Sequence, residues 1–220
     1  GHLIFLSSYR VYADLQHPIT ENAPLLADVI KNDETFLKTE DYALPKIACE
    51  RFIRSESKTE NWTIVRPVIS TSDRRFDLVT LSGHEIPDAA AEGKTLLLPE
   101  VARNLTASVD WAGNDGKLIA NLLFKKDALC HTYTVSSAQN LTWGEVADIY
   151  ERLVGIKFRW TTVEEYVKTG HGGYGLTYDR LYDRKVDNYE ILKVTGLKSS
   201  DFTSLENGIK IELEKIRDQK

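Results

Sequence analysis

The sequence contains no methionine, only two cysteines, and no apolar run near the roughly 18–20 residues that a membrane-spanning helix needs. It opens without a signal peptide, so we expect a cytoplasmic protein with no membrane partner. Cys49 and Cys130 are too few for a disulfide framework, and we expect both to be reduced thiols. The chain begins with Gly-His instead of Met, and together with the missing methionines this leads us to expect a truncated or incomplete chain.

The charge of the chain argues against several classes of partner. The net charge is −5, with 28 Lys and Arg against 33 Asp and Glu, which disfavours nucleic acid or an anionic membrane as the main partner. The five histidines are scattered without metal-ligand spacing, so we expect no metal site. A chain of 220 residues is nevertheless long enough to bury a core, as one domain or as one and a half.

Residues 1–70 show the order strand, loop, helix, strand. The apolar run "LIFLSS" (3–8) lacks alternation, which is typical of a strand buried on both faces of a parallel sheet. Apolar residues recur at helical spacing from about residue 42 to 57, and "NWTIVRPVIS" (61–70) predicts a second strand. This order predicts one parallel crossover unit in an α/β fold.

Beyond residue 76 the pattern is mixed. Thr142 is expected to cap a helix that Gly155 ends. The pattern predicts two further strands and four further helices, namely strands at 95–99 and 131–137 and helices at 111–126, 142–155, 162–170 and 202–216.

Tyr42 stands four residues before Lys46, in "EDYALPKIACERF" (40–52), at the start of the predicted helix. This spacing places both side chains on one helical face. A phenol, whose pKa is about 10, is a poor base at neutral pH unless a nearby ammonium group stabilises the phenolate. Pro45 is accepted in the first turn of a helix, which implies that the helix begins close to Tyr42.

The Tyr–Lys spacing is not specific by itself, because Tyr189 and Lys193 repeat it in "YEILK". The context of the first pair is more informative. Ser7 and Ser8 end the strand before it, at the carboxyl edge of the sheet, where open α/β folds bind their ligands. The second pair lacks such a strand, and we interpret it as a surface feature.

Several short motifs occur in a fixed order around Tyr42, and they are Ser7-Ser8, Val11-Tyr12-Ala13, Pro18-Ile19-Thr20-Glu21, Tyr42 with Lys46, Glu50, and Arg66-Pro67. In this order they resemble the middle of an extended short-chain dehydrogenase/reductase, the group of NAD-dependent sugar-nucleotide epimerases and dehydratases. That family usually has a strand with Ser-Ser or Ser-Thr, then Val-Tyr-Gly, Pro-x-x-Glu, Tyr-x-x-x-Lys with a Glu four residues on, and Arg-Pro.

The resemblance implies a fold and a division of the chain. Residues 1–75 would form a partial Rossmann-type catalytic region, the carboxyl half of a parallel sheet. Residues 76–220 would form mainly a smaller mixed α/β substrate-binding region and the C-terminal helices, with allowance for segments that return to the sheet.

The resemblance also implies residue roles. Ser8 would be the catalytic hydroxyl, Tyr42 the acid/base, and Lys46 the group that tunes Tyr42 and holds the nicotinamide ribose. The expected cofactor-binding residues are Ser7, Tyr42, Lys46, Arg66 and Pro67. The expected substrate-binding residues are Ser8, Tyr9, Arg74, Arg75 and Arg180, since guanidinium groups suit a diphosphate, although a solvent-exposed charged loop explains the arginines equally well.

One expected part of the family pattern is missing. "GHGGYG" (170–175) satisfies G-x-G-x-x-G, but it follows a predicted helix where a dinucleotide fingerprint would follow a strand. We interpret it as a loop. The fingerprint of the family precedes the serine strand, and the chain contains no such sequence.

We therefore predict an NAD(P)-dependent epimerase/dehydratase or reductase that acts on a nucleotide sugar or a related alcohol. Proton transfer by Tyr42, Lys46 and Ser8 would accompany hydride transfer with NAD or NADP. The sequence is compatible with a homodimer. Two alternatives stay open: a non-catalytic relative that serves as a binding protein, RNA included, and a truncated fragment that is inactive alone.

Overall fold

The computed structural model describes residues 1–39 and 42–218, and its contacts divide the chain into two compact units. After residue 75 the chain returns to the first unit twice. The first unit comprises Gly1–Val68, Gly113–Ala138 and Val186–Phe202, and the second comprises Ile69–Ala112, Gln139–Lys185 and Thr203–Lys220.

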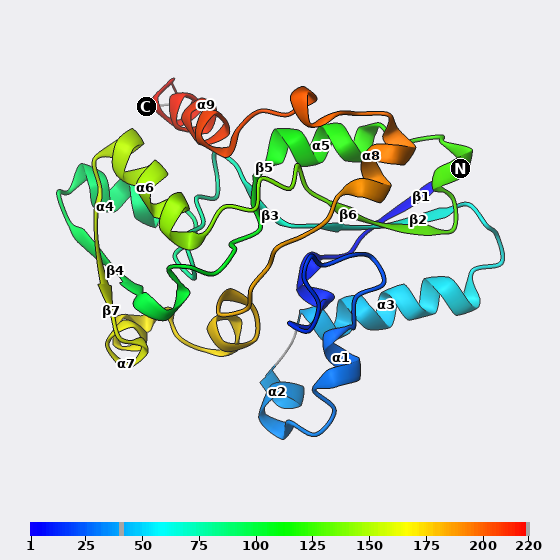
Figure 1. Ribbon diagram of the computed structural model, residues 1–220, viewed down its shortest axis with the longest axis horizontal. Helices are drawn as coiled ribbons and strands as arrows, with labels where there is room; N and C mark the ends of the chain where they lie inside the picture. The colour runs from blue at the N-terminus through cyan, green and yellow to red at the C-terminus, as the bar shows by residue number, and fades with distance from the viewer. Residues whose placement is uncertain (40–41, 219–220) are drawn as a thin grey trace. The chain divides into compact units, whose positions relative to one another are not determined.

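The first unit contains a three-stranded parallel sheet in the order β1-β2-β6 (Figure 1). Leu3 of β1 lies opposite Trp62 of β2, and Thr63 lies opposite His131 of β6. The elements of this unit are β1 (Leu3–Leu6), η1 (Tyr9–Val11), α1 (Leu26–Val29), α2 (Glu34–Thr39), α3 (Ala43–Glu56), β2 (Trp62–Pro67), α5 (Ala112–Ala120, in this unit from Gly113), η3 (Lys126–Ala128), β6 (His131–Val135), α8 (Tyr189–Thr195) and η6 (Ser199–Asp201).

Helices cover both faces of this sheet. Helix α3 lies along one face, while α5 and α8 lie along the other (Figure 1). The core on the α5 side joins Val65 of β2, Leu118 of α5 and Ile191 of α8. β2 lies between two strands and is buried from Trp62 to Arg66, so both of its faces are apolar or internally paired, as a central parallel strand requires.

Strand β1 is more exposed than the sequence pattern indicated. Leu3 and Leu6 are 52% and 53% exposed. Within the described residues β1 pairs only with β2, so one of its edges has no neighbouring strand. The prediction of a strand here is confirmed, but the prediction that both of its faces are buried is wrong.

The second unit contains two separate parallel strand pairs, β3 with β5 and β4 with β7. Its elements are β3 (Ile69–Thr71), α4 (Glu85–Ala91), β4 (Thr95–Pro99), η2 (Glu100–Ala102), β5 (Val109–Trp111), α6 (Trp143–Val154), β7 (Lys157–Thr161), α7 (Val163–Tyr166), η4 (Val167–His171), η5 (Leu176–Arg180) and α9 (Leu205–Asp218).

Of two predicted helices, α6 has the predicted ends and α5 is shorter than predicted. Thr142 caps α6 in a capping box with Glu145, and Gly155 ends it with a φ of 71°, so both predictions are confirmed. The helix predicted over 111–126 is shorter, because α5 ends at Ala120. Turns follow, and Phe124 adopts a φ of 60°, which a continuing right-handed helix cannot contain.

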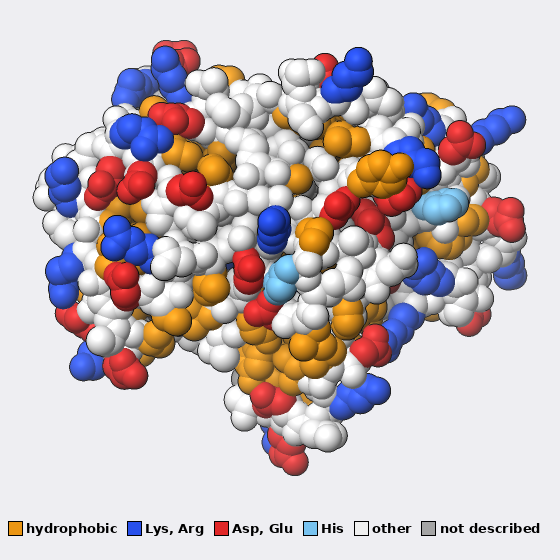
Figure 2. All heavy atoms as spheres, viewed as in Figure 1, with side chains coloured by type: hydrophobic (Ala, Val, Ile, Leu, Met, Phe, Trp, Pro, Cys, Tyr) orange, Lys and Arg blue, Asp and Glu red, His pale blue; other side chains and the backbone are white. Residues whose placement is uncertain are grey.

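Within the described part of the chain, no helix combines the length and the apolar character that crossing a bilayer demands. Cys49 and Cys130 are both free thiols, as expected. Figure 2 shows acidic and basic side chains interspersed over the face that it presents.

Two helical glycines allow a matched test of packing. A Cβ added at Gly208 of α9 would lie 2.5 Å from Cβ and Cγ of Trp111, whereas one added at Gly116 of α5 would meet nothing within 4 Å. Alanine is favoured over glycine inside a helix by about 0.8–1.0 kcal/mol. We expect Gly116→Ala to stabilise the protein by up to about that amount, and Gly208→Ala to destabilise it by about 1–3 kcal/mol through overpacking. Urea unfolding measures both, and a stabilising Gly208→Ala would contradict the packing of α9 on Trp111.

Candidate active site

Ser8 lies just after β1 and caps a short helix. Its backbone is extended, with φ −160° and ψ 148°, and its Oγ accepts the N–H of Arg10 at 3.2 Å. This bond fixes the first turn of η1. Ser8 is buried, at the carboxyl edge of a parallel strand, which is where the sequence placed it.

Tyr42 and Lys46 lie at the start of α3. Tyr42 is the N-terminal cap residue and 39% exposed, so the prediction that the helix begins beside it is confirmed. The Nζ atom of Lys46 lies 5.7 Å from the centre of the Tyr42 ring and donates to the carbonyl of Leu6 at 2.8 Å. The structure therefore brings the Tyr–Lys pair to the end of β1, two residues from Ser8.

Arg10 is a member of this cluster that the sequence did not single out. Its Cζ atom lies 4.9 Å from the centre of the Tyr42 ring. Because Ser8 caps the turn that contains Arg10, the cation links the serine segment to Tyr42. Two cations, Arg10 and Lys46, thus lie beside one phenol. The only signal in the sequence is a basic residue two positions after Ser8, which is too common to be informative.

Glu50 connects three elements behind the site. Its Oε1 accepts the Ser7 hydroxyl at 2.5 Å and Nε of Arg66 at 2.9 Å, and its Oε2 accepts Nη2 of Arg66 at 2.5 Å. The two charged side chains are 2% and 3% exposed. One buried carboxylate therefore joins the end of β1, helix α3 and strand β2. It belongs to the Glu that follows the Tyr–Lys motif by four residues.

Arg66 extends this cluster toward the loop after η1. Its Cζ lies 4.7 Å from the centre of the Tyr12 ring, and Nη1 donates to the carbonyl of Glu21 at 3.1 Å. The Tyr12 hydroxyl shares a hydrogen bond of 2.7 Å with Oγ1 of Thr134 on β6. Burial raises the pKa of Tyr12, which keeps its phenol neutral near physiological pH.

The predicted cofactor contacts of Ser7, Arg66 and Pro67 stay predictions from the resemblance. In the structure the Ser7 hydroxyl and the Arg66 guanidinium hold Glu50, and Pro67 is the last residue of β2. Tyr9, predicted to touch the substrate, is buried in η1. Their packing gives these residues a structural role whether or not a ligand reaches them.

The arginines predicted to bind a diphosphate lie in the second unit, and two of them share a carboxylate. Arg75 bonds Asp77 through Nε at 2.5 Å and Nη2 at 2.9 Å, and Arg180 lies 3.5 Å from the same carboxylate. Arg180 also pairs with Asp179 at 3.0 Å, while Arg74 is exposed. Their contact with a substrate stays a prediction.

Two motifs were not expected to form a site, namely the second Tyr–Lys pair and the glycine-rich "GHGGYG". Tyr189 is 62% exposed on α8, and Lys193 lies 4.0 Å from Glu190. In "GHGGYG", Gly170 and His171 end η4, and only residues 172 and 173 lie outside helical turns, so the interpretation of the whole motif as a loop is wrong. No strand leads into the motif, because η4 follows α7. Across residues 1–39 and 42–218, no group of three or more His, Cys, Asp or Glu side chains could hold a metal ion.

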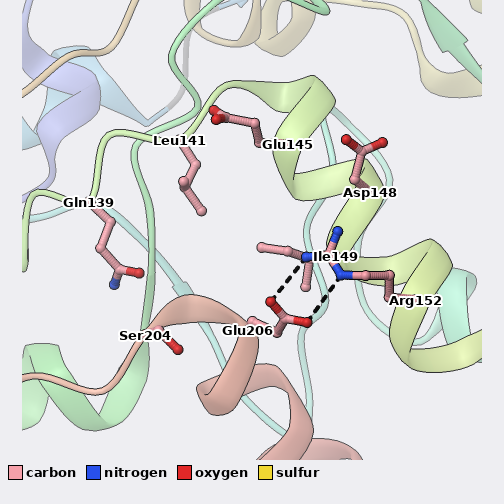
Figure 3. Close-up of a pocket in the computed structure, with 8 residues that line it drawn as sticks. All are labelled: Gln139, Leu141, Glu145, Asp148, Ile149, Arg152, Ser204 and Glu206. Atoms are coloured by element: carbon pink, nitrogen blue, oxygen red, sulfur yellow. Dashed lines mark hydrogen bonds and ion pairs between the residues drawn. The ribbon is translucent and has the colours of Figure 1, made fainter.

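A pocket of about 290 Å³ between α6 and α9 of the second unit is a weaker candidate. Figure 3 shows Arg152 and Glu206 facing each other across one side of it, joined by hydrogen bonds of 3.2 and 3.0 Å. Glu145 is engaged by the Thr142 cap. Because Arg152 and Glu206 pair with each other and Glu145 is held by the cap, we rank this pocket below the cluster at β1 as a candidate for proton transfer.

Comparisons with known proteins support the fold of the chain. No protein-family model and no curated protein sequence matches. Among solved structures, a dTDP-glucose 4,6-dehydratase from Bacillus anthracis in complex with NAD has a TM-score of 0.68 at 15% identity, over 97% of this chain and 60% of its own. A UDP-glucuronic acid 4-epimerase from Bacillus cereus, in complex with UDP-glucuronic acid and NAD, has a TM-score of 0.70 at 12% identity, over 99% and 62%.

A short-chain dehydrogenase/reductase superfamily protein from Agrobacterium tumefaciens with bound NAD has a TM-score of 0.63 at 17% identity, over 98% of this chain and 66% of its own. The chain thus spans 60–66% of the length of these three structures. The resemblance seen in the sequence is confirmed at the level of fold: the chain has the Rossmann-type α/β fold of the short-chain dehydrogenase/reductase epimerases and dehydratases, over their C-terminal part.

The residues present fit only one end of a nicotinamide cofactor. Tyr42, Lys46 and Ser8 are polar groups at the carboxyl edge of a parallel sheet, a position suited to the reacting end. The pyrophosphate end needs backbone N–H groups in a glycine-rich turn between a strand and a helix. The sequence offers no such turn.

The effect of the buried ion pair between Arg66 and Glu50 can be compared with that of an exposed ion pair on the same helix. Arg66→Ala leaves the Glu50 carboxylate buried without its counter-ion, which should cost about 3–5 kcal/mol of unfolding free energy. Arg51 pairs with Asp28 at 2.8 Å, but both are more than half exposed, so Arg51→Ala should cost about 0–1 kcal/mol. Denaturant unfolding of the two variants measures the difference. Equal losses would show that Glu50 and Arg66 do not hold α3 on the sheet.

The raised pKa of Glu21 leads us to expect a pH-dependent contribution to the stability of the folded protein. Burial raises its pKa even though the N–H of Thr134 donates to Oε1 at 2.8 Å. The folded state therefore favours the protonated carboxyl, and this stabilisation is present below the unfolded pKa of about 4.3 and is lost as the pH rises through the folded pKa. Glu21→Gln should be more stable than the wild type at about pH 7 and no different at about pH 3.

Thermal unfolding at the two pH values measures this effect, and Glu34→Gln, at an exposed position, serves as the control. A Glu21→Gln variant that is less stable than the wild type at neutral pH would show that the folded protein requires the charged carboxylate.

Proposed function

We propose that this chain carries the proton-transfer half of an NAD(P)-dependent epimerase, dehydratase or reductase, acting on a nucleotide sugar or a related alcohol. The observation that carries the proposal is the joint placement of Ser8, Tyr42 and Lys46 at the carboxyl end of β1. The fold supports it, because solved structures with this fold include enzymes crystallised with NAD and with UDP sugars.

The chemistry assigned to the chain is the removal of a proton from a substrate hydroxyl. Bound NAD(P) would supply the hydride acceptor or donor. The hydrogen of the carbon–hydrogen bond would leave with its electron pair as hydride, the hydroxyl proton would pass to the phenolate oxygen of Tyr42, and a carbonyl would form. Return of the hydride and the proton restores an alcohol, so the protein is unchanged over a cycle.

Neighbouring groups support Tyr42 in this role. Lys46 and Arg10 lie 5.7 and 4.9 Å from the centre of its ring, so two cations are close to the phenol. The Ser8 hydroxyl would orient the substrate oxygen toward Tyr42. Glu50 and Ser7 do not take part in the transfer, but they fix α3 against β1 and so set the distance between these groups.

The main alternative is that the 220 residues are inactive alone. The absence of a glycine-rich strand–turn–helix sequence and the coverage of 60–66% of the solved structures favour it. A non-catalytic binding role is less supported, since it leaves the Ser8, Tyr42 and Lys46 arrangement without a purpose. The preference for NAD or NADP, a cytoplasmic location and a homodimer stay predictions.

The test uses the complete product of the reading frame that encodes these residues. NAD(H) and NADP(H) titration followed by a screen of nucleotide sugars should identify a turnover. Tyr42→Phe, which removes only the hydroxyl, should then lower kcat by about 10²–10⁴-fold with little change in cofactor affinity. Tyr189→Phe alters the second Tyr–Lys pair and should leave kcat unchanged. Full turnover by the Tyr42→Phe variant would remove Tyr42 as the acid/base.

A further inference from the structure

A polar pocket of about 320 Å³ lies beside β6 in the first unit, and the proposed function does not use it. The loop after η1, the end of α3, strand β6 and the start of α8 contribute to its walls. Its lining residues include Glu21, Arg54, Cys130, Thr132 and Glu190, and we call it the β6 pocket. The volume is at the lower end of the range for small-molecule sites, about 300–1,000 Å³.

The pocket contains one guanidinium group. Arg54, in the last turn of α3, donates from Nη2 to Oγ1 of Thr132, and its Cζ lies 5.6 Å from the centre of the Trp62 ring. Partial burial lowers the pKa of Arg54, and the positive charge of Arg66 lowers it further. The folded protein therefore holds this cation at the pocket wall and compensates its charge only in part.

Two carboxylates line the same pocket. Oε1 of Glu21 accepts the N–H of Thr134 at 2.8 Å, yet burial raises the pKa of this carboxyl, and the negative charge of Asp187 raises it further. Glu190 is exposed at the start of α8. Burial raises the pKa of Tyr133 to about 12, and the charges of Glu190 and Glu21 add to this rise, so both carboxylates lie near that phenol.

The positive and negative groups of the pocket do not neutralise each other. An ion pair between Arg54 and Glu21 would raise the pKa of the arginine and lower that of the carboxyl, and both pKa values are shifted in the opposite direction. Strand β6 keeps the two groups apart, because Arg54 bonds Thr132 whereas Glu21 bonds Thr134. Two residues of a strand span about 6–7 Å. Each charge has thus lost water without gaining the other as a counter-ion.

We propose that the β6 pocket binds a small zwitterion whose carboxylate and ammonium groups are several bonds apart, as in an ω-amino acid. The carboxylate pairs with the Arg54 guanidinium, and the ammonium group pairs with the Glu21 carboxylate, with Glu190 near it. One molecule then offsets the desolvation of both side chains, whereas an ion of a single sign leaves one of them uncompensated. An α-amino acid is too short, because its two charged groups share one carbon atom.

The pocket is separate from the candidate active site. Ser8 follows the carboxyl end of β1, whereas the pocket is lined by the first residues of β6. In this parallel sheet His131 lies opposite Thr63, and Thr63 lies opposite Ile4, so the start of β6 is next to the early part of β1 and β2. The inference therefore goes beyond the proposed function, and its test needs no turnover.

The experiment is a titration followed through the amide NMR signals of Thr132 and Thr134. The probes are 4-aminobutyrate, 5-aminopentanoate and 6-aminohexanoate, and the controls at equal ionic strength are butyrate, n-butylamine and glycine. We expect at least one probe to saturate these signals with a Kd at least about tenfold lower than that of every control, because each control lacks one charge or the length to reach both partners. Equal Kd values for probes and controls, or no saturation by any probe at about 0.1 M, would overturn the proposal.

Charge-removing variants place the ligand. Arg54→Gln and Glu21→Gln should each raise the Kd of the best probe at least about tenfold. Arg51→Gln and Glu34→Gln, at exposed ion pairs outside the pocket, should leave it unchanged. Thermal unfolding checks that each variant is folded, and Glu21→Gln decides alone if Arg54→Gln does not fold, since we expect it to be more stable than the wild type at neutral pH. Undiminished binding by Glu21→Gln would contradict the ammonium contact and with it the proposal.

The two cysteines provide an independent readout. Cys130 lines the β6 pocket, whereas Cys49 is an exposed thiol on α3 outside it. Saturation with the best probe should slow the reaction of Cys130 with a maleimide several-fold and leave the rate at Cys49 unchanged, which peptide mass spectrometry resolves. A Cys130 rate that is the same with and without the probe would show that the zwitterion binds elsewhere and would reject the assignment of the pocket.

Discussion

The buried carboxylate of Glu50 is the contact on which the candidate site depends. It accepts hydrogen bonds from Ser7 at the end of β1 and from Arg66 on β2, while it belongs to α3. A buried ion pair contributes little net stability compared with apolar packing, but breaking it is costly. Its effect here is geometric, because Lys46 and Tyr42 lie one and two helical turns before Glu50. Fixing Glu50 therefore sets how α3 presents them to β1.

Local signals in the sequence predicted the parts of the structure that are decided locally. Thr142 and Gly155 mark the ends of α6 through hydrogen bonds within a few residues. Pro45 marks the start of α3 because its ring fixes φ and because a first-turn residue needs no N–H donor within the helix. The exposure of β1 could not be predicted, because it depends on which strands lie beside it. Arg10 was missed for a related reason: its position over Tyr42 exists only after η1 and α3 have packed together.

The two Tyr–Lys pairs show what distinguishes a site from a spacing. Both lie on helices with the lysine near the tyrosine ring, at 5.7 Å for Lys46 and 5.8 Å for Lys193. Lys193 lies near Glu190 on an exposed helical surface, whereas Lys46 bonds the end of a strand that leads into Ser8. The two pairs therefore differ in the strand that lies beside the first of them. The first pair lies beside a strand end that delivers a hydroxyl and a backbone carbonyl, which is the arrangement that the proposed function uses.

Lys46 also shows how one side chain can contribute to the fold and to the proposed chemistry. At the edge of β1 its ammonium satisfies a backbone carbonyl, and it shields apolar surface by lying near the Phe5 ring. The same group is the cation nearest in sequence to Tyr42 on α3. Its ammonium donates to the Leu6 carbonyl and at the same time lies 5.7 Å from the centre of the Tyr42 ring, so the contact that holds the end of β1 also keeps this cation beside the phenol.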